Sequence, residues 1–310
     1  MRISRLLTFA AMLLPVVLFA QARPALVATG YDSPVFHRLA PGQLVTLFVS
    51  GLPASGRAVA SAVPLPTELA GVSVTLHQAA LPGPVRIPLL SVEPLSEVVT
   101  ALVVQMPFEM EPGSYIGPIT AGPARPDTGE LQVSWGSEAG PRVSIIPVQD
   151  NIKLLRSCDA FPEALREDPR GRIRPCLPTV THAGGNLVNF ESPARAGEVV
   201  VFWAFGLGRP PARPVTGGPA PAPIIMPTGK WGLHFAFGAN APAKPPFAGP
   251  ESNPVYVGVV PGYVGLYQIN MKLPEQIPSG TPACTSFTDS NLTVTVWGAT
   301  SSDAISICVR

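Results

Sequence analysis

The chain is poor in charge, in histidine and in cysteine. Only 13% of its 310 residues are charged, about half the usual share, and it has four histidines and four cysteines. Without Arg2 and Arg5, which lie in the first 22 residues, 19 basic and 20 acidic residues remain. A balance this close to neutral excludes the strongly basic surface that nucleic-acid binding requires. We therefore expect neither nucleic acid nor an anionic membrane as a partner.

The chain also lacks the short motifs of common catalytic and metal sites. It contains no Gly-x-Ser-x-Gly, no phosphate-binding loop, no HExxH and no CxxC. A zinc site is the alternative use of the cysteines, but His182 is the one histidine close in sequence to any of them. We predict no catalytic residue, no cofactor and no metal. A secreted hydrolase remains an alternative, with His182 beside Gly184-Gly185 as the candidate base, because triads assemble from distant positions.

Long apolar segments are missing except at the N-terminus. Arg2 and Arg5 precede an apolar stretch, Leu6 to Ala20, that ends at the small-residue site Ala20-Gln21-Ala22. The stretch is short for a bilayer span and contains Pro15. We predict that residues 1–22 are a signal peptide, with a buried helix as the alternative. The mature chain is then not membrane-spanning, and it is secreted, periplasmic or on the cell surface.

Proline and glycine are abundant and divide the chain into short pieces. There are 39 prolines and 29 glycines in a chain that is 46% apolar, which favours a folded protein of short strands over long helices. In Leu266 to Leu273, the apolar Tyr267, Ile269 and Met271 alternate with Gln268 and Asn270. This period of two indicates a strand with one buried face. The pattern predicts an all-β fold of immunoglobulin-like sandwiches, although periodicity does not distinguish them from closed barrels.

Two halves of the chain resemble each other. Ala40 to Leu52 is echoed by Arg195 to Leu207, and the glycine pairs Gly42/Gly197 and Gly51/Gly206 are both 155 residues apart. Leu131-Gln132-Val133-Ser134-Trp135-Gly136 is answered by Leu292-Thr293-Val294-Thr295-Val296-Trp297-Gly298. A fixed self-similarity indicates tandem domains. We predict two immunoglobulin-like (TIG-like) sandwiches, residues 30–148 and 180–310.

The segment 149–179 differs in composition from both halves. It contains eleven charged residues of alternating sign, and Cys158 and Cys176 bracket its C-terminal part. We predict a solvated connector, with an exposed recognition loop as the alternative. In an oxidising compartment the four cysteines form two disulfides, and we expect nearest-neighbour pairing, Cys158–Cys176 and Cys284–Cys308, among three possible connectivities.

Exposed aromatic residues are the other candidate binding feature. Trp231 follows Gly229-Lys230 and Tyr263 follows Pro261-Gly262, so both are adjacent to turns. We predict them as ligand contacts, because flat aromatic faces stack on ring-shaped ligands.

The segment Val260 to Met271, followed by Pro274, resembles the hallmark "APGxVGLYQvNvxvP" of the Solibacter uncharacterised C-terminal domain family. Pro193 to Val200 with Gly206-Leu207-Gly208 is similar to its "PAxPGexvxxyaxGLG" element, and Leu39 to Gly42 and Pro64 to Val74 are similar to its N-terminal half. The resemblance implies a two-part extracytoplasmic Ig-like or TIG-like protein and implies no activity. The first half lacks the usual "YxSpxQiNfqvP" element.

Three functions follow from these observations. The first is a non-catalytic secreted or cell-surface binding or structural module, whose partner is an unidentified protein or polysaccharide. The second is a carbohydrate-binding module that uses Trp231 and Tyr263. The third is the secreted hydrolase with His182.

Overall fold

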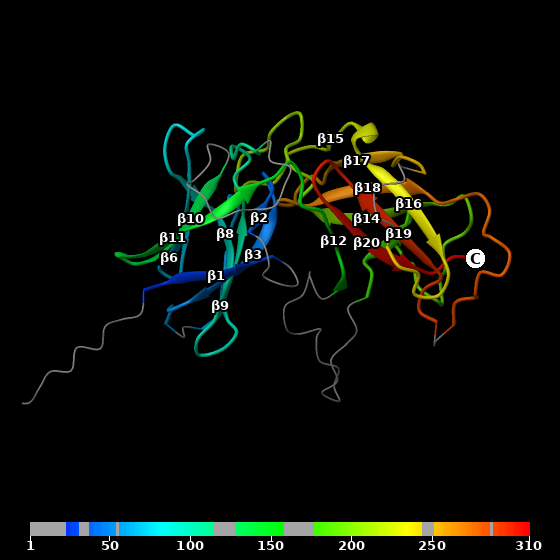
Figure 1. The fold of residues 1–310 in the computed structure, drawn as a ribbon, viewed down its shortest axis with the longest axis horizontal. Coiled ribbons are helices and arrows are strands. Elements are labelled where there is room, and N and C mark those ends of the chain that lie inside the picture. Colours follow the sequence, from blue (N-terminus) through cyan, green and yellow to red (C-terminus); the bar gives the residue numbers. More distant parts are fainter. Residues whose placement is uncertain are drawn as a thin grey trace, which may run out of the picture.

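The computed structural model describes residues 23–30, 37–53, 56–113, 128–157, 177–243, 251–285 and 288–310. Over these ranges the chain forms two β-sandwiches, at the left and the right of Figure 1. The predicted all-β class, with two tandem immunoglobulin-like sandwiches, is confirmed. The predicted signal peptide, residues 1–22, lies outside the described residues.

The first sandwich consists of two sheets. One sheet contains, in spatial order, β1 (Ala25–Thr29), β3 (Leu44–Ser50), β9 (Thr100–Gln105), β8 (Leu89–Pro94) and β4 (Ala58–Val59). The other contains β2 (Arg38–Leu39), β11 (Glu138–Pro147), β10 (Gly129–Trp135), β6 (Val72–Gln78) and β5 (Glu68–Leu69), and β7 (Val85–Ile87) also pairs with β6. Strand β2 runs parallel to β11, and the other described pairs in this sandwich are antiparallel.

The second sandwich has the same plan. Its larger sheet contains β12 (Lys153–Leu154), β14 (Val199–Phe205), β18 (Tyr267–Lys272), β17 (Tyr256–Val259) and β15 (Ile224–Ile225), and β13 (Val180–His182) also pairs with β14. Its smaller sheet contains β16 (Gly232–Phe237), β19 (Leu292–Trp297) and β20 (Ser302–Ile307). A short 3-10 turn, η1 (Thr228–Lys230), precedes β16.

The sequence repeats lie on corresponding strands. The apolar runs after Gly42 and Gly197 form β3 and β14, which pair with the six-residue strands β9 and β18 in the corresponding sheets. The two glycines have nearly equal φ angles of 72° and 71°. Positive φ favours glycine because a Cβ atom is disfavoured there. The duplication is therefore visible in strand order and in backbone conformation.

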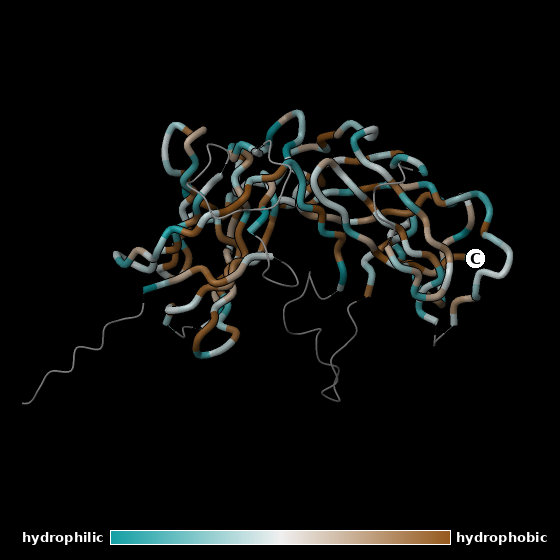
Figure 2. The backbone as a smooth tube through the Cα atoms, viewed as in Figure 1, coloured by the Kyte–Doolittle hydropathy of each residue, from teal (hydrophilic) through white to brown (hydrophobic). Residues whose placement is uncertain are grey.

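Each sandwich has its own apolar core, visible as the hydrophobic colour along the inner strands in Figure 2. In β18, Tyr267, Ile269 and Met271 are fully buried, as their alternation predicted. Gln268 and Asn270 are half-buried, and Gln268 Nε2 donates to Asn270 Oδ1 at 2.7 Å. The predicted register of this strand is confirmed.

The start of the predicted connector differs from expectation. Strand β12 lies inside the 149–179 range but pairs with β14, so it belongs to the second sandwich. Asp150 and Lys153 are only 2% and 4% exposed. The prediction of a solvated connector is therefore wrong for residues 150–155, because average composition does not reveal which charged residues acquire partners. Residues 158–176 lie outside the described part of the chain.

Candidate functional site

The two aromatic residues predicted as ligand contacts have different surroundings. Trp231 is 4% exposed and packs in the second core together with Leu233 and Phe235. Tyr263 is 60% exposed. Trp231 therefore presents no aromatic face to a ligand, which corrects that prediction. Tyr263 retains the exposure that a ligand contact needs.

Trp297, which the sequence reasoning did not select, lies on the outer face of the smaller sheet. Leu292, Val294 and Val296 of β19 enter the core, so the next residue points away from it. The indole lies across Gly232, where any Cβ atom would overlap it, and stacks on His234 with ring centroids 6.0 Å apart. Its side chain is partly exposed.

A single extra residue explains this orientation. In the first copy Leu131, Val133 and Trp135 alternate, and Trp135 packs against the first core. The second copy has one more residue, Val296, between the repeated leucine and the tryptophan. Because a shift of one residue moves a side chain to the opposite face of a strand, Trp297 turns outward. The extra residue is visible when the two halves are aligned, so the outward position of Trp297 could have been predicted from the sequence.

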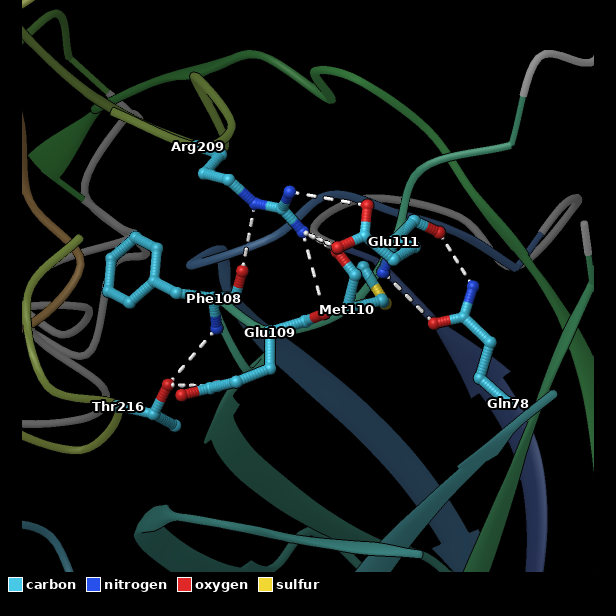
Figure 3. Close-up of polar contacts among 7 residues, drawn as sticks. All are labelled: Gln78, Phe108, Glu109, Met110, Glu111, Arg209 and Thr216. Atoms are coloured by element: carbon cyan, nitrogen blue, oxygen red, sulfur yellow. Dashed lines mark hydrogen bonds and ion pairs between the residues drawn. The ribbon is translucent and has the colours of Figure 1, made fainter. Parts of the chain in front are cut away.

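The junction between the sandwiches centres on Arg209, which follows β14 (Figure 3). Its Nε donates to the Phe108 carbonyl at 3.0 Å, and its Nη2 donates to the Met110 carbonyl at 2.6 Å. Its two terminal nitrogens lie 3.0 and 3.2 Å from the two carboxylate oxygens of Glu111. The planar guanidinium suits this arrangement because its donors form a fixed fork. One side chain of the second sandwich thus holds the segment that leaves β9 in the first.

Two further side chains hold the same segment from either side. The Thr216 hydroxyl donates to Glu109 Oε2 at 2.7 Å and accepts from the Phe108 N–H at 3.0 Å. From within the first sandwich, Gln78 Nε2 donates to the Glu111 carbonyl at 2.6 Å, and the Glu111 N–H donates to Gln78 Oε1 at 3.0 Å. These bonds, drawn in Figure 3, satisfy the backbone of the segment, so its position is set by both sandwiches.

A second contact lies where the chain passes from one sandwich to the other. The carboxylate of Asp150 accepts hydrogen bonds from the N–H groups of Ala299, Thr300 and Ser301 at 2.7, 3.1 and 2.8 Å. It also accepts the Ser301 hydroxyl at 2.6 Å. These donors belong to the turn between β19 and β20. The link between the sandwiches is thereby fastened to the second one.

A third contact brings the loop after Arg209 against the first sandwich. Gln105 Oε1 accepts the Gly217 N–H at 2.6 Å, and the Gly217 carbonyl accepts the Leu65 N–H at 2.7 Å. Gly265, in the turn of the hallmark segment, lies close to the Gly42 carbonyl, since a Cβ atom there would come within 3.0 Å of it. The turn that contains Gly265 therefore also contributes to the junction.

His182 occupies a separate polar cluster at the end of β13. Its Nδ1 lies 2.5 Å from Glu198 Oε1, and its Nε2 lies 3.1 Å from the Ser192 carbonyl oxygen and 3.2 Å from the Ser192 hydroxyl. The hydrogen bond with Glu198 raises the pKa of His182 above its ordinary value, against the opposing effect of burial. Burial acts to raise the pKa of Glu198, but hydrogen bonds from His182 and from the Arg195 N–H lower it overall.

The line from Ser192 through His182 to Glu198 has the order of a serine hydrolase triad. Two features oppose that role. The residue after Ser192 is Pro193, which has no N–H to stabilise an oxyanion, and the Ser192 N–H already donates to Asn189 Oδ1 at 2.8 Å. The Ser192 carbonyl also competes with the hydroxyl for Nε2. The cluster therefore suits an ionic clamp better than a nucleophile.

The second predicted disulfide is present. Cys284 and Cys308 are bonded, with Cα atoms 5.9 Å apart, and the bond anchors the loop before β19 to the end of β20. Cys158 and Cys176 lie outside the described residues, so their pairing stays a prediction. Within the described ranges, no cluster of three or more His, Cys, Asp or Glu side chains is arranged to hold a metal. No helix in the described part is long and apolar enough to cross a membrane.

Of the comparisons with known proteins, the one with solved structures found similar proteins. No protein-family model matches the chain, and no curated protein matches it. The FdeC adhesin of Escherichia coli aligns over 92% of this chain and 66% of its own length, at 12% identity and a TM-score of 0.21. The adhesin InvE of Yersinia pseudotuberculosis aligns over 92% of this chain and 58% of its own, at 11% identity and a TM-score of 0.21.

A marsupial T cell receptor aligns over 91% of this chain and 98% of its own, at 10% identity and a TM-score of 0.16. The chain spans less than two thirds of the length of either adhesin. At these TM-scores the alignments carry no functional argument. The fold assignment rests on the strands and cores themselves.

Proposed function

We propose that the protein is a non-catalytic, extracytoplasmic binding or structural module whose two sandwiches act as one unit. The observation that carries this proposal is the junction, where Arg209, Thr216 and Gln105 join the two sandwiches through directional hydrogen bonds. Tandem domains ordinarily move relative to each other unless their interface restrains them. A restrained pair holds its surface loops at fixed spacing, which suits presentation to a large partner.

The extracytoplasmic location is part of the proposal. Its support is the Cys284–Cys308 disulfide, because disulfides persist mainly in oxidising compartments. The expected signal peptide points the same way. We also propose membership in the Solibacter uncharacterised C-terminal domain family, supported by the hallmark segment that forms a turn followed by the core strand β18.

The test is a binding panel of polysaccharides and extracellular proteins, read by biolayer interferometry with product analysis of each ligand. We expect binding that leaves the ligand chemically intact. Loosening the junction by Arg209→Ala should weaken the binding of any ligand that contacts both sandwiches. Release of cleaved product, abolished by His182→Ala, would contradict the non-catalytic assignment and favour the hydrolase.

A carbohydrate-binding module is the second candidate, and the outward position of Trp297 favours it. A partly exposed indole on a sheet face provides an apolar platform, and His234, on which it stacks, lies 3.8 Å from the exposed carboxylate of Glu251. A glycan array of the wild type and of single-alanine variants distinguishes Trp297 from Tyr263 as the ligand contact. Loss of a glycan signal in Trp297→Ala but not in Tyr263→Ala would support this site. The reverse result would assign Tyr263, and no signal for the wild type would exclude the module.

A further inference from the structure

The loop between β13 and β14 is held at both ends by one histidine. His182 ends β13, and its ring reaches Ser192 at the far end of the loop and Glu198 just before β14. The loop carries Leu187 and Phe190, which are 52% and 42% exposed. Leu187 is held by its bridge to Thr181 and by neighbouring backbone hydrogen bonds, whereas the end of the loop that carries Phe190 and Ser192 is the part in contact with the His182 ring.

Both ring nitrogens of His182 face groups that accept hydrogen bonds. The Glu198 carboxylate on the Nδ1 side is an acceptor when ionised, and the Ser192 carbonyl on the Nε2 side is always an acceptor. A neutral imidazole whose N–H points to Glu198 can accept the Ser192 hydroxyl at Nε2, 3.2 Å away, but it cannot donate to the Ser192 carbonyl. The imidazolium carries two N–H groups and satisfies both acceptors. The geometry is thus complementary to the protonated ring.

The first copy of the repeat provides an internal comparison. Glu198 Oε2 accepts the N–H of Arg195, three residues earlier, at 2.8 Å, and in the same way Gln43 Oε1 accepts the N–H of Ala40 at 2.8 Å. The turn before β3 or β14 therefore needs a side-chain oxygen that accepts a hydrogen bond, but it does not need a charged one. The carboxylate in the second copy leaves Oε1 to bind His182. The charge of Glu198 thus has a role beyond the turn.

The other charged groups near the cluster come from the same turn, from the end of β18 and from the segment that follows it. Arg195 opposes protonation of His182 through its positive charge. Beyond it, the Glu275 carboxylate packs against Gly197 and pairs with Lys272 at 2.5 Å. That pair is neutral as a unit, so Glu198 supplies the negative charge that His182 faces directly.

We propose that protonated His182 is a clamp that fastens the loop 183–193 to the start of β14, and that the clamp closes only while Glu198 is ionised. This proposal does not depend on the proposed binding function. It assigns a pH-controlled conformation to a loop with exposed apolar side chains, at one end of the second sandwich.

The pH window follows from the directions of the two shifts. The pKa of His182 is raised above 6.5, so its contribution to stability is complete below 6.5 and is lost as the pH rises through the raised value. The pKa of Glu198 is lowered below 4.5, so its contribution is complete above 4.5 and is lost as the pH falls through the lowered value. The clamp is therefore favoured between 4.5 and 6.5, and it opens as the pH rises through the raised pKa of His182 or falls through the lowered pKa of Glu198.

The test is an NMR titration of the His182 ring together with amide-exchange protection factors for the loop, between about pH 5.5 and about pH 9. The Asn189 amide is the best reporter, because it donates to the same Ser192 carbonyl that His182 binds. We expect a His182 midpoint above 6.5 and loss of loop protection through that midpoint. His182→Gln identifies the resonance.

Glu198→Gln is the decisive variant, since Gln43 shows that glutamine supports the turn. It should fold, lower the His182 midpoint and abolish the pH dependence of loop protection. A wild-type midpoint at or below 6.5, or loop protection that does not change across the titration, would overturn the proposal. Labelling of Ser192 by a fluorophosphonate probe would also overturn it, because the ring would then act as a base.

Discussion

Replacing Asp150 by alanine should be among the most damaging single changes outside the two cores. The carboxylate is 2% exposed and accepts the N–H groups of Ala299, Thr300 and Ser301. Alanine removes both carboxylate oxygens that accept these hydrogen bonds. The turn between β19 and β20 would then contain three backbone donors without a partner.

The loss in free energy of unfolding can be estimated from these hydrogen bonds. A hydrogen bond to a charged group contributes about 1.5–3 kcal/mol, so the three N–H bonds and the Ser301 hydroxyl bond together set an upper limit of about 12 kcal/mol. Water can enter after the truncation, because Ala299 is exposed and the turn lies at the surface. We therefore expect a loss of about 3–5 kcal/mol, the usual cost of breaking a buried charged contact. For a chain of 310 residues that unfolds as one unit, with an unfolding entropy of about 2.1 cal/mol/K per residue, the loss corresponds to a Tm lower by about 5–8 °C.

The assay is urea and thermal unfolding of Asp150→Ala beside Asp289→Ala, a change at an exposed aspartate. The control should stay within about 0.5 kcal/mol of the wild type. If Asp150→Ala were equally mild, the carboxylate would not fasten the link, and the reasoning about this contact would be refuted.

The remaining predictions concern strand β18 and the Cys158–Cys176 disulfide. Ile269→Ala should cost about 2–5 kcal/mol because the side chain is fully buried, whereas Gln268→Ala, at a half-buried position, should change stability by only about 0.5 kcal/mol. Chemical denaturation measures both, and a large loss from Gln268→Ala with a tolerated Ile269→Ala would contradict the assignment of Ile269 to the core face. Mass spectrometry of a non-reduced digest should show Cys158 linked to Cys176, since the antiparallel bridge between Arg156 and Pro178 and the hydrogen bond from the Ser157 N–H to the Leu177 carbonyl at 2.8 Å hold the residues that flank the two cysteines together. Free thiols would contradict that pairing.

Much of the fold was predictable because its signals are local. The repeated Gly42 and Gly197 mark equivalent turns with positive φ, and the alternation in Leu266 to Leu273 marks the buried face of β18. Trp231 was misassigned for a physical reason. Adjacency to a turn does not determine which face a side chain takes, whereas its two-residue spacing from Leu233 indicates the core.

The junction could not be predicted because its partners are distant in sequence. Arg209 lies in a proline-rich segment, and the carbonyls that it binds are about a hundred residues earlier. Asp150 binds a turn about 150 residues later. The sequence around neither residue allows its partner to be predicted, and a charged side chain is by default expected to be exposed.

The central claim, that the two sandwiches form one restrained unit, is tested most directly by the distance between them in solution. Spin labels at Glu138→Cys, in the β10–β11 hairpin, and at Asp289→Cys, before β19, occupy exposed positions in different sandwiches. Double electron–electron resonance should give one narrow distance distribution, which Arg209→Ala broadens. A broad distribution in the otherwise wild-type protein would contradict the claim.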